Sequence, residues 1–538
     1  MENTLTGLLE RRSREADPGR VHLPADGATI TLPELLDRAQ FLAGDFYDRG
    51  VRPGDVVGMV LQNGPDFLTT LLGLMYAGAV PAPLALPAAL RGLDAYGRHL
   101  AAVVADSGMR FLVSGPEMRR IRSRFDDALA AVEFIDIGDL AAANSRLCVP
   151  VDPDALAFIQ YTSGSTSSPK GVMLSQRNIA TGLDAIRQAS AMTHADTLAV
   201  WLPQFHDMGL VSSLVALAHC GELTLWPPAA FVRDPAKWLT EFAARGCTLS
   251  PAPNFSYDLL IEVADRFPPG SLDLSRWRLA YNGAEPVQAG TVRRFATAFA
   301  VHGFRAESMY PVYGMAEATL AVTFSPLDTA PRLRWVDRDA LNDRRVVPAE
   351  PGAPGTRVLV GVGQPVPDMR VRVGEGTAAD RVVDEIQISG GSVTGGYYRR
   401  PRAEHFTPDG WLRTGDLGFV DDGELFVVGR VKDMIIIRGQ NIYPEDAEAL
   451  VRDLPDVYRH RCAVVPRVTD EHEELVLVAE TKLDDPARRD ALGREIAAAL
   501  RDGLGLADVV VRLAEPHSLP QTSSGKIQRG RVQAALAS

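Results

Sequence analysis

Short apolar runs alternate along the chain with longer stretches of helical periodicity. These short runs include "DVVGMVL", "FLVSG", "RLAYNG" and "LFVVGR", and each predicts a strand. Segments rich in alanine and leucine lie between these runs and predict helices. This alternation is typical of an α/β protein whose sheets are largely parallel.

The pattern divides the chain into a large and a small domain. A length of 538 residues exceeds what a single hydrophobic core accommodates, so at least two domains are expected. A fresh set of strands and helices begins after Arg430, which predicts a large amino-terminal domain over 1–430 and a small α+β domain over 431–538. From Phe324 to Gly363 the pattern weakens into "VVPAEPGAPGT", which is rich in proline and glycine and predicts an inserted loop or linker.

The most apolar region of the chain does not predict a membrane span. Residues 67–90 are interrupted by Pro81, Pro83 and Pro87, so we expect a buried helix followed by a proline-rich loop. The first residues, "MENTLTGLLERRSREADPG", lack the apolar core of a signal peptide. The four cysteines are far apart and form no C-x-x-C pair, which indicates neither a zinc site nor disulfides and suits a cytoplasmic protein.

Composition and charge exclude one further class of function. The chain is 46% hydrophobic and 23% charged, as expected of a folded globular protein, and its net charge is −12. Nucleic-acid-binding proteins usually present a basic face to the phosphates, so this acidic chain is not expected to bind nucleic acid. Solubility explains the acidic excess more simply.

A loop rich in hydroxyl groups follows one of the predicted strands. In "FIQYTSGSTSSPKGVMLSQRNI", residues 158–179, we expect a buried strand, a tight turn over 162–171 and a helix capped by Ser175. Glycine lets an anion approach the backbone, the hydroxyls donate hydrogen bonds and Lys170 adds positive charge, so a polyphosphate is the expected ligand. The spacing differs from the Walker A motif because Gly171 follows the lysine. A polar surface turn is the alternative that the loop alone leaves open.

Seven motifs together resemble those of the adenylate-forming superfamily, which includes acyl-CoA synthetases, luciferases and peptide-synthetase adenylation domains. They are "YTSGSTSSPKG", "WLPQFHDMGL", "NGAEP", "YPVYGMAEATL", "GWLRTGDLG", "GRVKDMIIIRGQNIYP" and "LPQTSSGKIQR", in the order and spacing of that superfamily. The resemblance covers nearly the whole chain. It implies a large adenylation domain of stacked, mostly parallel sheets and a small mobile lid domain, with ATP and Mg²⁺ as cofactors.

The resemblance places most of the implied nucleotide site in the large domain. It implies that the phosphate loop cradles the β- and γ-phosphates, that Glu317 and Thr162 hold Mg²⁺, and that Tyr313 stacks on adenine. The residues of this domain implied to bind the nucleotide are Thr162, Ser163, Gly164, Ser165, Thr166, Lys170, Asn282, Gly283, Ala284, Glu285, Tyr313, Gly314, Met315 and Ala316. Taken singly, a glutamate is more often a solvated surface residue, and a tyrosine beside a glycine more often belongs to the core.

Further residues complete the implied site. Asp416 is implied to bind both ribose hydroxyls, because a carboxylate offers two acceptors to a vicinal diol. Arg430 is implied to contact ribose and phosphate, and Lys526 to be the catalytic lysine that bridges the carboxylate and the α-phosphate. His206 resembles the residue that gates the acyl pocket in this superfamily and positions the carboxylate. Lys432 resembles the residue about which the lid domain turns. The implied catalytic residues are therefore Lys526, His206 and Glu317. Simpler interpretations stay open. Asp416 would be a turn aspartate and Arg430 a salt-bridging arginine, whereas Lys526 and Lys432 would be solvated and His206 structural.

The sequence around the motifs most resembles that of fatty acyl-AMP ligases. "APNFSYDLL" and "RGQNIYPEDAE" are similar to that family, and so is an insertion around 325–365, after the magnesium motif. In that family the insertion packs on the large domain and is linked to poor use of free coenzyme A. The resemblance implies activation of a fatty acid to acyl-AMP with release of pyrophosphate, followed by transfer to the phosphopantetheine arm of a holo acyl carrier protein.

Two positions depart from the superfamily's pattern, and two other functions stay open. Ser167 stands where many relatives have a second glycine, and Gln176 where a histidine is common. An acyl-CoA synthetase that uses free coenzyme A is one alternative, and a non-catalytic nucleotide-binding relative is the other. The insertion favours the ligase over the synthetase, and the presence of the implied catalytic residues favours an enzyme.

Overall fold

The structure, a computed structural model, describes residues 4–87, 93–125, 129–140, 145–162, 169–374, 382–437, 440–468, 473–504, 509–521 and 527–537. The chain divides into two units. Unit 1 comprises Met1–Pro331, Gly363–Arg370 and Ile388–Leu412, and unit 2 comprises Arg332–Val362, Val371–Gln387 and Arg413–Ser538. The domain boundary that the sequence predicts between 430 and 431 lies within unit 2 and stays a prediction.

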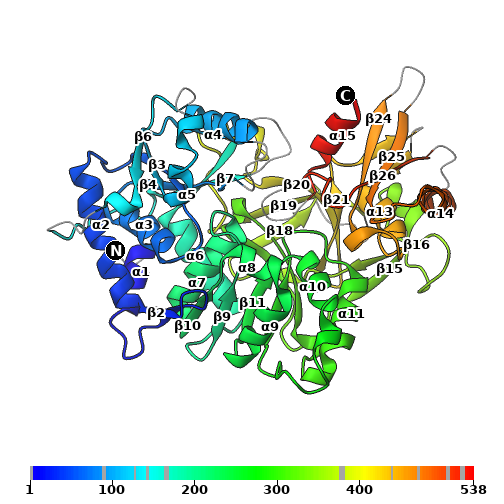
Figure 1. The fold of residues 1–538 in the computed structure, drawn as a ribbon, viewed down its shortest axis with the longest axis horizontal. Coiled ribbons are helices and arrows are strands. Elements are labelled where there is room, and N and C mark those ends of the chain that lie inside the picture. The colour runs from blue at the N-terminus through cyan, green and yellow to red at the C-terminus, as the bar shows by residue number, and fades with distance from the viewer. Residues whose placement is uncertain are drawn as a thin grey trace. The chain divides into compact units, whose positions relative to one another are not determined.

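A nine-stranded sheet lies within unit 1 (Figure 1), in the order β17–β14–β13–β12–β11–β9–β10–β1–β2. Its strands are β1 (Arg20–Leu23), β2 (Ala28–Thr31), β9 (Thr197–Val200), β10 (Glu222–Leu225), β11 (Leu249–Ala252), β12 (Leu279–Asn282), β13 (Met309–Met315), β14 (Leu320–Phe324) and β17 (Gln364–Pro365). The strands from β13 to β1 pair in parallel, and β2, β14 and β17 pair antiparallel. β10, β11 and β12 are buried at every position, as parallel strands covered on both faces are. The predicted α/β class with largely parallel sheets is confirmed.

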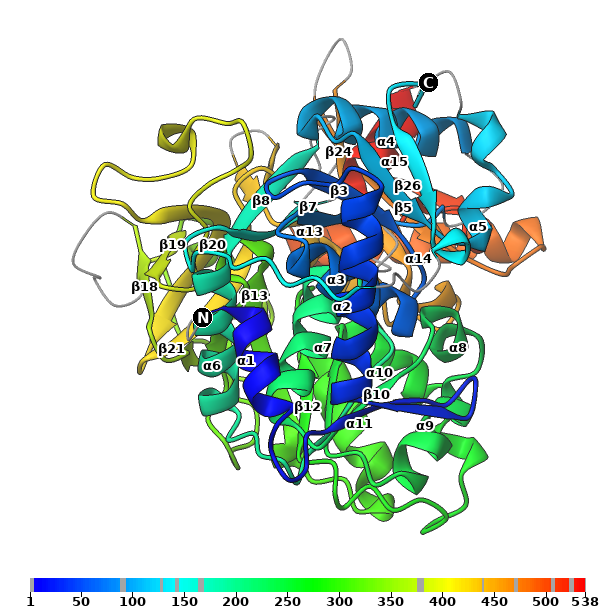
Figure 2. The ribbon, with the colours of Figure 1, turned by 90° about the vertical axis from the view of Figure 1, so that its left-hand side faces the viewer.

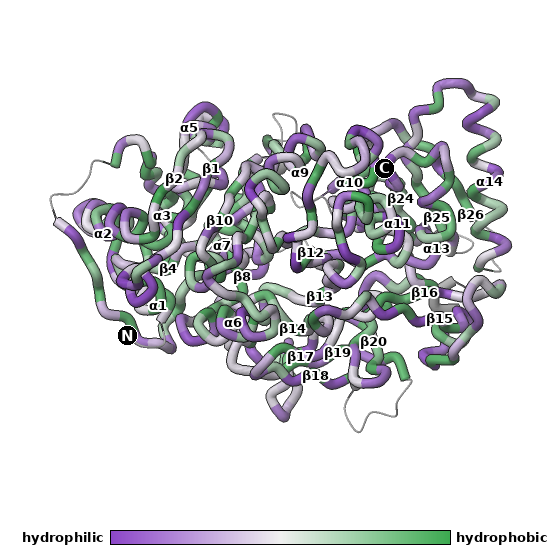
Figure 3. The backbone as a smooth tube through the Cα atoms, turned by 90° about the horizontal axis from the view of Figure 1, so that it is seen from below, coloured by the Kyte–Doolittle hydropathy of each residue, from purple (hydrophilic) through white to green (hydrophobic). Residues whose placement is uncertain are grey.

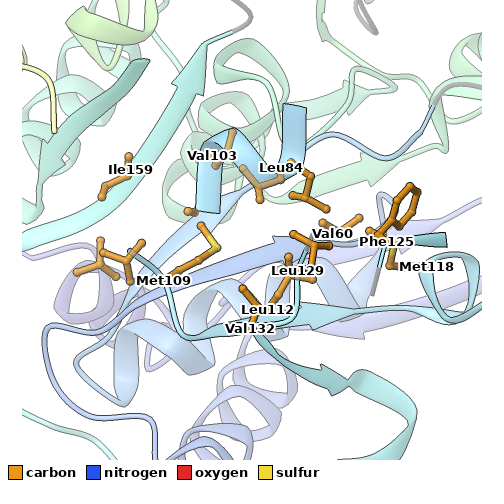
Figure 4. Close-up of a cluster of buried hydrophobic side chains, with 14 of the residues drawn as sticks. Val60, Leu84, Val103, Met109, Leu112, Met118, Phe125, Leu129, Val132 and Ile159 are labelled. Atoms are coloured by element: carbon orange, nitrogen blue, oxygen red, sulfur yellow. The ribbon is translucent and has the colours of Figure 1, made fainter. Parts of the chain in front are cut away.

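A second sheet of unit 1 has the order β4–β3–β5–β6, and all its strand pairs are parallel. Its strands are β3 (Val56–Val60), β4 (Val80–Pro83), β5 (Phe111–Ser114) and β6 (Glu133–Asp136). β3 and β5 are the strands predicted from "DVVGMVL" and "FLVSG". This sheet and α4 (Leu93–Ser107) contribute to a buried hydrophobic cluster that includes Val60, Val103 and Leu112 (Figure 4).

The segment after α3 (Pro65–Tyr76) differs from the sequence prediction. α3 is the predicted buried helix, and all its residues from Phe67 onward are buried. The predicted proline-rich loop is wrong for residues 80–83, which form β4 and include Pro81 and Pro83. β4 is an edge strand of its sheet, where a residue without a backbone N–H is tolerated. No helix in the described part of the chain is long and apolar enough to cross a membrane.

Helices cover the sheets of unit 1. α2 (Leu32–Asp48) and α3 lie side by side (Figure 2), and α1 (Leu5–Arg12) contacts α6 (Gln176–Ala189) and α7 (Asp207–His219). Further helices of this unit are α5 (Pro116–Arg119), α8 (Pro228–Arg233), α9 (Pro235–Ala244), α10 (Asn254–Ile261) and α11 (Ala289–Phe299). α2 begins with a capping box, in which Thr31 and Glu34 each accept the other's backbone N–H.

Unit 2 contains most of a four-stranded sheet and all of a three-stranded one. The first has the order β18 (Met369–Val373), β19 (Asp384–Gly390), β20 (Leu412–Asp421), β21 (Glu424–Arg430), and the second the order β24 (Cys462–Val468), β25 (Glu473–Glu480), β26 (Val509–Ala514). A short hairpin joins β22 (Ile435–Ile437) to β23 (Gln440–Ile442), and the helices are α12 (Arg338–Asn342), α13 (Pro444–Val451), α14 (Pro486–Leu504) and α15 (Arg529–Ala537). α14 is mostly hydrophilic with interspersed apolar positions (Figure 3); its buried Leu492, Ile496 and Leu500 recur every fourth residue and form one face.

The predicted insertion is more regular than its sequence suggests. Its proline- and glycine-rich part, 346–355, has no helix or strand, as predicted, but the flanking residues form the antiparallel hairpin of β15 (Leu333–Asp337) and β16 (Thr356–Val360) with α12 between them. The prediction of a loop or linker for the whole segment is therefore wrong. Val336, Leu341 and Leu359 of the insertion are buried in one cluster with Phe426 and Tyr443. Burial of these side chains contributes to the order of the segment.

Polar contacts also hold the insertion to the carboxy-terminal residues of unit 2. Arg357 Nε lies 2.6 Å from a carboxylate oxygen of Asp446 at the start of α13, and its guanidinium lies over the ring of Tyr443, 5.4 Å from the centroid. Arg357 also donates to the backbone oxygen of Val428 at 2.7 Å, and Arg338 donates to that of Gly503 in α14. We call this set of polar and apolar contacts the insertion clasp.

A second ion pair, between half-buried side chains, anchors α15. The guanidinium of Arg529 donates to both carboxylate oxygens of Glu448 in α13, at 3.2 and 2.8 Å, and lies 3.2 Å from Glu445. Just before Arg529, Gln528 N–H donates to the oxygen of Pro520 at 2.8 Å, and Gln521 pairs with Ile527. The two ends of the segment 522–526 are thereby held together.

Arg529→Met should lower the free energy of unfolding of unit 2 by about 1.5–3 kcal/mol, because it removes the charge-assisted hydrogen bonds to the half-buried carboxylate of Glu448. Urea denaturation followed by circular dichroism measures the change. Arg531→Met is the control, since Arg531 is exposed and donates to the side chain of the neighbouring Gln528, so its loss should cost less than about 0.5 kcal/mol. Equal stabilities of the two variants would contradict this assignment.

Candidate active site

Most sequence-predicted residues of unit 1 follow the carboxyl ends of parallel strands. β9, β11, β12 and β13 are parallel neighbours, so their carboxyl ends meet at one edge of the sheet. His206 follows β9, Asn282 ends β12, and residues 313–317 lie at and beyond the end of β13. In open α/β sheets, ligands bind in the crevice outside this edge. The edge is therefore the candidate site in unit 1.

The predicted phosphate loop connects the strands of a hairpin, β7 (Leu156–Thr162) and β8 (Lys170–Ser175), in which Thr162 pairs with Lys170. The predicted helix cap is confirmed, because the hydroxyl of Ser175 accepts the N–H of Asn178 at 3.1 Å. The predicted turn is too long, because Gly171 already lies in β8, where strand pairing begins at Lys170. Outside the described residues lie Ser163, Gly164, Ser165, Thr166 and the side chain of Thr162.

The predicted adenine turn, 282–285, is fixed by its neighbours. Asn282 is fully buried, and its amide donates to the side chain of Asn254 at 3.3 Å. A side chain at Gly283 would collide with Val312, and Ala284 has a φ of 64°, in the left-handed region. The carboxylate of Glu285 accepts the N–H of Phe255 at 2.6 Å, so it also supports α10. The sequence did not indicate Asn254 as part of this arrangement.

The motif around Tyr313 forms a distorted strand end. β13 and β14 change register between Tyr313 and Gly314, and a Cβ at Gly314 would overlap the backbone oxygen of Leu320. Met315 completes the strand, and Ala316 begins the 3₁₀ helix η6 (Ala316–Ala318) that carries Glu317. The bulge thereby places Glu317 beyond the end of β13, in η6, which lies close to β8 of the phosphate hairpin.

Glu317 is held by a tyrosine that the sequence did not indicate. The phenol of Tyr397 donates to Oε1 of Glu317 at 2.6 Å. Burial, and then the nearby carboxylate, raise the pKa of Tyr397, so its hydroxyl stays protonated and donates. The ammonium of Lys170 lies 5.6 Å from the centroid of the same ring. The structure thus brings Lys170 and Glu317 to one tyrosine.

The described side chains fit Mg²⁺ only together with a phosphate ligand. Within the described ranges, no three His, Cys, Asp or Glu side chains form a group that could hold a metal ion. Mg²⁺ is commonly bound through one or two carboxylates plus substrate phosphates and water. Glu317 beside the phosphate hairpin suits that arrangement, whereas it does not suit a metal held by protein ligands alone.

The predicted acyl motif lies at the start of α7. His206 is the residue before the helix, and its ring lies 4.7 Å from that of Phe205. The loop is rigidly held: Gln204 is fully buried, its N–H donates to Asn63 at 2.8 Å, and its side chain accepts the N–H of Gly64 at 3.1 Å. The predicted gating role of His206 stays a prediction.

The predicted ribose and hinge residues lie in unit 2. Asp416 and Arg430 face each other across β20 and β21, with Arg430 Nε 2.8 Å from Asp416 Oδ1. Asp416 lies within β20 and is almost fully buried; the preceding Gly415 has a φ of 73°, in the left-handed region that glycine adopts without strain. Lys432 is exposed just after β21. Lys526 lies outside the described residues. The residues that flank its segment, Gln521 and Ile527, pair with each other.

Comparison with known proteins identifies the family to which these motifs correspond. Residues 10–398 match the family described as AMP-binding enzyme. The chain is 33% identical to a putative acyl-CoA synthetase of Caulobacter vibrioides, over 93% of this chain and 89% of that protein. It is 32% identical to the medium-chain-fatty-acid–acyl-carrier-protein ligase JamA of Moorena producens, over 98% and 94% of the two chains. It is 35% identical to the long-chain-fatty-acid–AMP ligase FadD32 of Mycolicibacterium smegmatis, over 90% and 85%.

A solved structure matches the fold over the whole chain. A chain from a study of fatty acyl-adenylate ligases from E. coli and L. pneumophila has a TM-score of 0.91 and 30% identity, covering 99% of this chain and 98% of that one. The match confirms the predicted fold: a large α/β part with mostly parallel sheets followed by a carboxy-terminal α+β part.

Asp416→Ala should weaken ATP binding by about 1.5–3 kcal/mol, because two charge-assisted hydrogen bonds to the ribose hydroxyls would be lost. Isothermal titration calorimetry with ATP measures the affinity. Asp422→Ala is the matched control, since Asp422 is an exposed aspartate at the tip of the same hairpin. Unchanged affinity in Asp416→Ala would show that Asp416 serves only the pairing with Arg430 between β20 and β21.

Proposed function

The chain belongs to the family of AMP-binding enzymes, and on that premise we propose that it converts a fatty acid to acyl-AMP and transfers the acyl group to the phosphopantetheine thiol of an acyl carrier protein. In the first step a carboxylate oxygen forms a bond to the α-phosphorus of ATP. The bond between the α-phosphorus and the bridging oxygen breaks, and pyrophosphate leaves. In the second step the thiol attacks the acyl carbon, AMP leaves and a thioester forms.

The first step needs fixed positive charge more than it needs acid–base catalysis. Negative charge accumulates on the phosphoryl oxygens and on the leaving pyrophosphate, while the attacking carboxylate is already ionised near neutral pH. Lys170 at the base of the phosphate hairpin supplies one cation. Mg²⁺, held by Glu317 and in our proposal by Thr162, would neutralise charge on the phosphates. Lys526 would bridge the attacking carboxylate and the α-phosphate.

The remaining predicted residues orient the two substrates. Asp416 would bind the ribose hydroxyls, with Arg430 beside it, and Tyr313 and the turn 282–285 would contact adenine. His206, at the start of α7, would position the fatty-acid carboxylate. Each of these groups acts by holding a reacting atom in place, which lowers the barrier by removing orientational freedom before the reaction.

The observation that carries the choice of acceptor is the insertion clasp. Thioester formation in this proposal requires the residues after the hinge Lys432 to rotate so that a thiol reaches the acyl-adenylate. The clasp joins the insertion to Tyr443, to Asp446 in α13 and to Gly503 in α14, all beyond that hinge. Breaking a buried ion pair and uncovering buried side chains costs free energy, so the clasp opposes the rotation. A tethered carrier offsets this cost by docking, which raises the local concentration of its thiol.

The relatives support the proposal without deciding the acceptor. JamA bears the name of an acyl-carrier-protein ligase and FadD32 that of a fatty-acid–AMP ligase. The Caulobacter relative, at a similar identity, bears that of a putative acyl-CoA synthetase, so this remains the second candidate. A non-catalytic role is disfavoured by the presence of Glu317, Asp416, Arg430 and Lys526.

The acceptor is tested by offering purified protein, ATP and a panel of fatty acids either free coenzyme A or a holo carrier protein. We expect acyl-AMP to accumulate without an acceptor, little acyl-CoA to form, and the carrier to be acylated at least about tenfold faster than free coenzyme A, as tethering predicts. Mass spectrometry of the products gives both rates, and the apo carrier is the control. Acyl-CoA formation as fast as carrier acylation would move the protein to the acyl-CoA synthetases.

Asp446→Asn should increase acyl-CoA formation about fivefold, which corresponds to about 1 kcal/mol less resistance to rotation. Burial raises the pKa of Asp446 to about 6. Ionisation of this carboxyl group therefore lowers the stability of the folded protein as the pH rises through that value. A neutral asparagine amide at position 446 avoids this cost, so the variant should fold. Acyl-AMP formation should not change. The control is Asp343→Asn, on the exposed surface of the insertion. Equal acyl-CoA rates in the native protein and both variants would contradict a restraining role for the ion pair.

A further inference from the structure

A glycine-rich segment, 391–398, connects the phosphate hairpin to the residues around Glu317. On the hairpin side, Met173 N–H donates to the oxygen of Gly396 at 3.1 Å, and Tyr398 N–H donates to that of Gly171 at 2.8 Å. On the other side, Thr394 N–H donates to the backbone oxygen of Glu317 at 2.7 Å. We call this segment the bracket. Its backbone is hydrogen-bonded to both, so the bracket holds the phosphate hairpin and Glu317 at a constant separation.

Further hydrogen bonds keep the bracket rigid. The hydroxyl of Thr394 donates toward the backbone oxygen of Met173, and the amide of Asn178, from the first turn of α6, donates to the oxygens of Gly391 and Val393 at 2.7 and 3.0 Å. Thr319, which follows η6, donates through its hydroxyl to the oxygen of Ser392 at 2.8 Å. The backbone oxygens of Gly391, Ser392 and Val393 thus accept hydrogen bonds from Asn178, which follows the phosphate hairpin, and from Thr319, which follows Glu317.

Tyr397 is the side chain of the bracket that reaches both sites. It is 9% exposed, its hydroxyl donates to Oε1 of Glu317 at 2.6 Å, and the Lys170 ammonium lies 5.6 Å from its ring centroid. The ring of His405 packs against it at 4.4 Å with an interplanar angle of 62°. A cation at this distance from an aromatic face is attracted by its quadrupole. One side chain therefore contacts the predicted metal carboxylate and the predicted phosphate lysine.

We propose that Tyr397 is a positioning residue that sets the carboxylate of Glu317 and the ammonium of Lys170 for a divalent cation bound with the triphosphate. This inference rests on the proposed function. The phenol occupies one lone pair of Oε1 and fixes the carboxylate's rotation, which leaves a defined set of oxygen lone pairs for the cation. The ring face holds the ammonium by a cation–π contact, separate from the hydrogen bond that orients the carboxylate.

The two functions of the side chain can be separated by substitution. Tyr397→Phe keeps the ring beside Lys170 and His405 and removes only the hydroxyl that orients Glu317. Tyr397→Leu removes the ring as well. Tyr398→Phe is the matched control, because Tyr398 is the next residue and its ring instead packs on the apolar cluster of the second sheet and contacts the guanidinium of Arg399.

The readout is equilibrium binding, which does not depend on turnover. Binding of Mn²⁺ in the presence of a non-hydrolysable ATP analogue is measured by electron paramagnetic resonance, and binding of the analogue without divalent cation by calorimetry. We expect Tyr397→Phe to weaken Mn²⁺ binding about tenfold, the factor that loss of a hydrogen bond to a charged group produces, and to leave cation-free binding of the analogue unchanged. Tyr397→Leu should weaken both, and Tyr398→Phe neither.

A purely structural tyrosine gives a different pattern. If Tyr397→Phe binds Mn²⁺ as the native protein does, or if Tyr397→Phe and Tyr398→Phe weaken it equally, the positioning role is wrong. Thermal unfolding of each variant identifies a loss that comes from misfolding, and native-like folding of Tyr397→Phe with weakened Mn²⁺ binding supports the proposal. A native protein that binds neither the analogue nor Mn²⁺ would overturn the proposed function and this role with it. Normal native binding with an unaffected Tyr397→Phe would overturn this role alone.

Discussion

The parallel pairing of β9, β11, β12 and β13 is the constraint on which the site in unit 1 depends. Because these strands run in one direction, their carboxyl ends lie at one edge, where β12 ends with Asn282 and the segments after β9 and β13 carry His206 and Glu317. Burial of β10, β11 and β12 at every position keeps the edge rigid. A one-residue shift of register would reverse the faces of a strand and move its terminal residue out of the site.

Each unit uses its own interactions to hold charged groups in place. In unit 1, Tyr397 of the bracket contacts both Lys170 and Glu317, through its ring and its hydroxyl respectively. In unit 2, the insertion clasp sets the buried Arg357 against Asp446 beside a small apolar core. Separating charged groups from fixed partners costs free energy. In unit 1 this cost would keep ligand-binding groups in place, and in unit 2 it opposes rotation of the residues after Lys432.

The sequence predicted most of the fold because its strands are short, apolar and separated by helical segments, and the Ser175 cap because it depends on local residues. It predicted β4 and the insertion wrongly for opposite reasons. Pro81 and Pro83 suggested a loop but occupy an edge strand, which tolerates them. The proline- and glycine-rich part of the insertion suggested a loop, but its apolar residues pack against Phe426 and Tyr443, and Arg357 pairs with Asp446, all distant in sequence. Tyr397 was missed for the same reason: its contact with Glu317 spans 80 positions and leaves no local pattern.

The central claim is that the protein forms an acyl-adenylate from ATP and a fatty acid. Incorporation of labelled pyrophosphate into ATP tests it most directly, because this exchange requires the reversible formation of acyl-AMP and no acceptor thiol. The account predicts exchange that depends on both a fatty acid and Mg²⁺, and that Lys526→Ala loses while remaining folded. Absence of fatty-acid-dependent exchange in the folded native protein would contradict it.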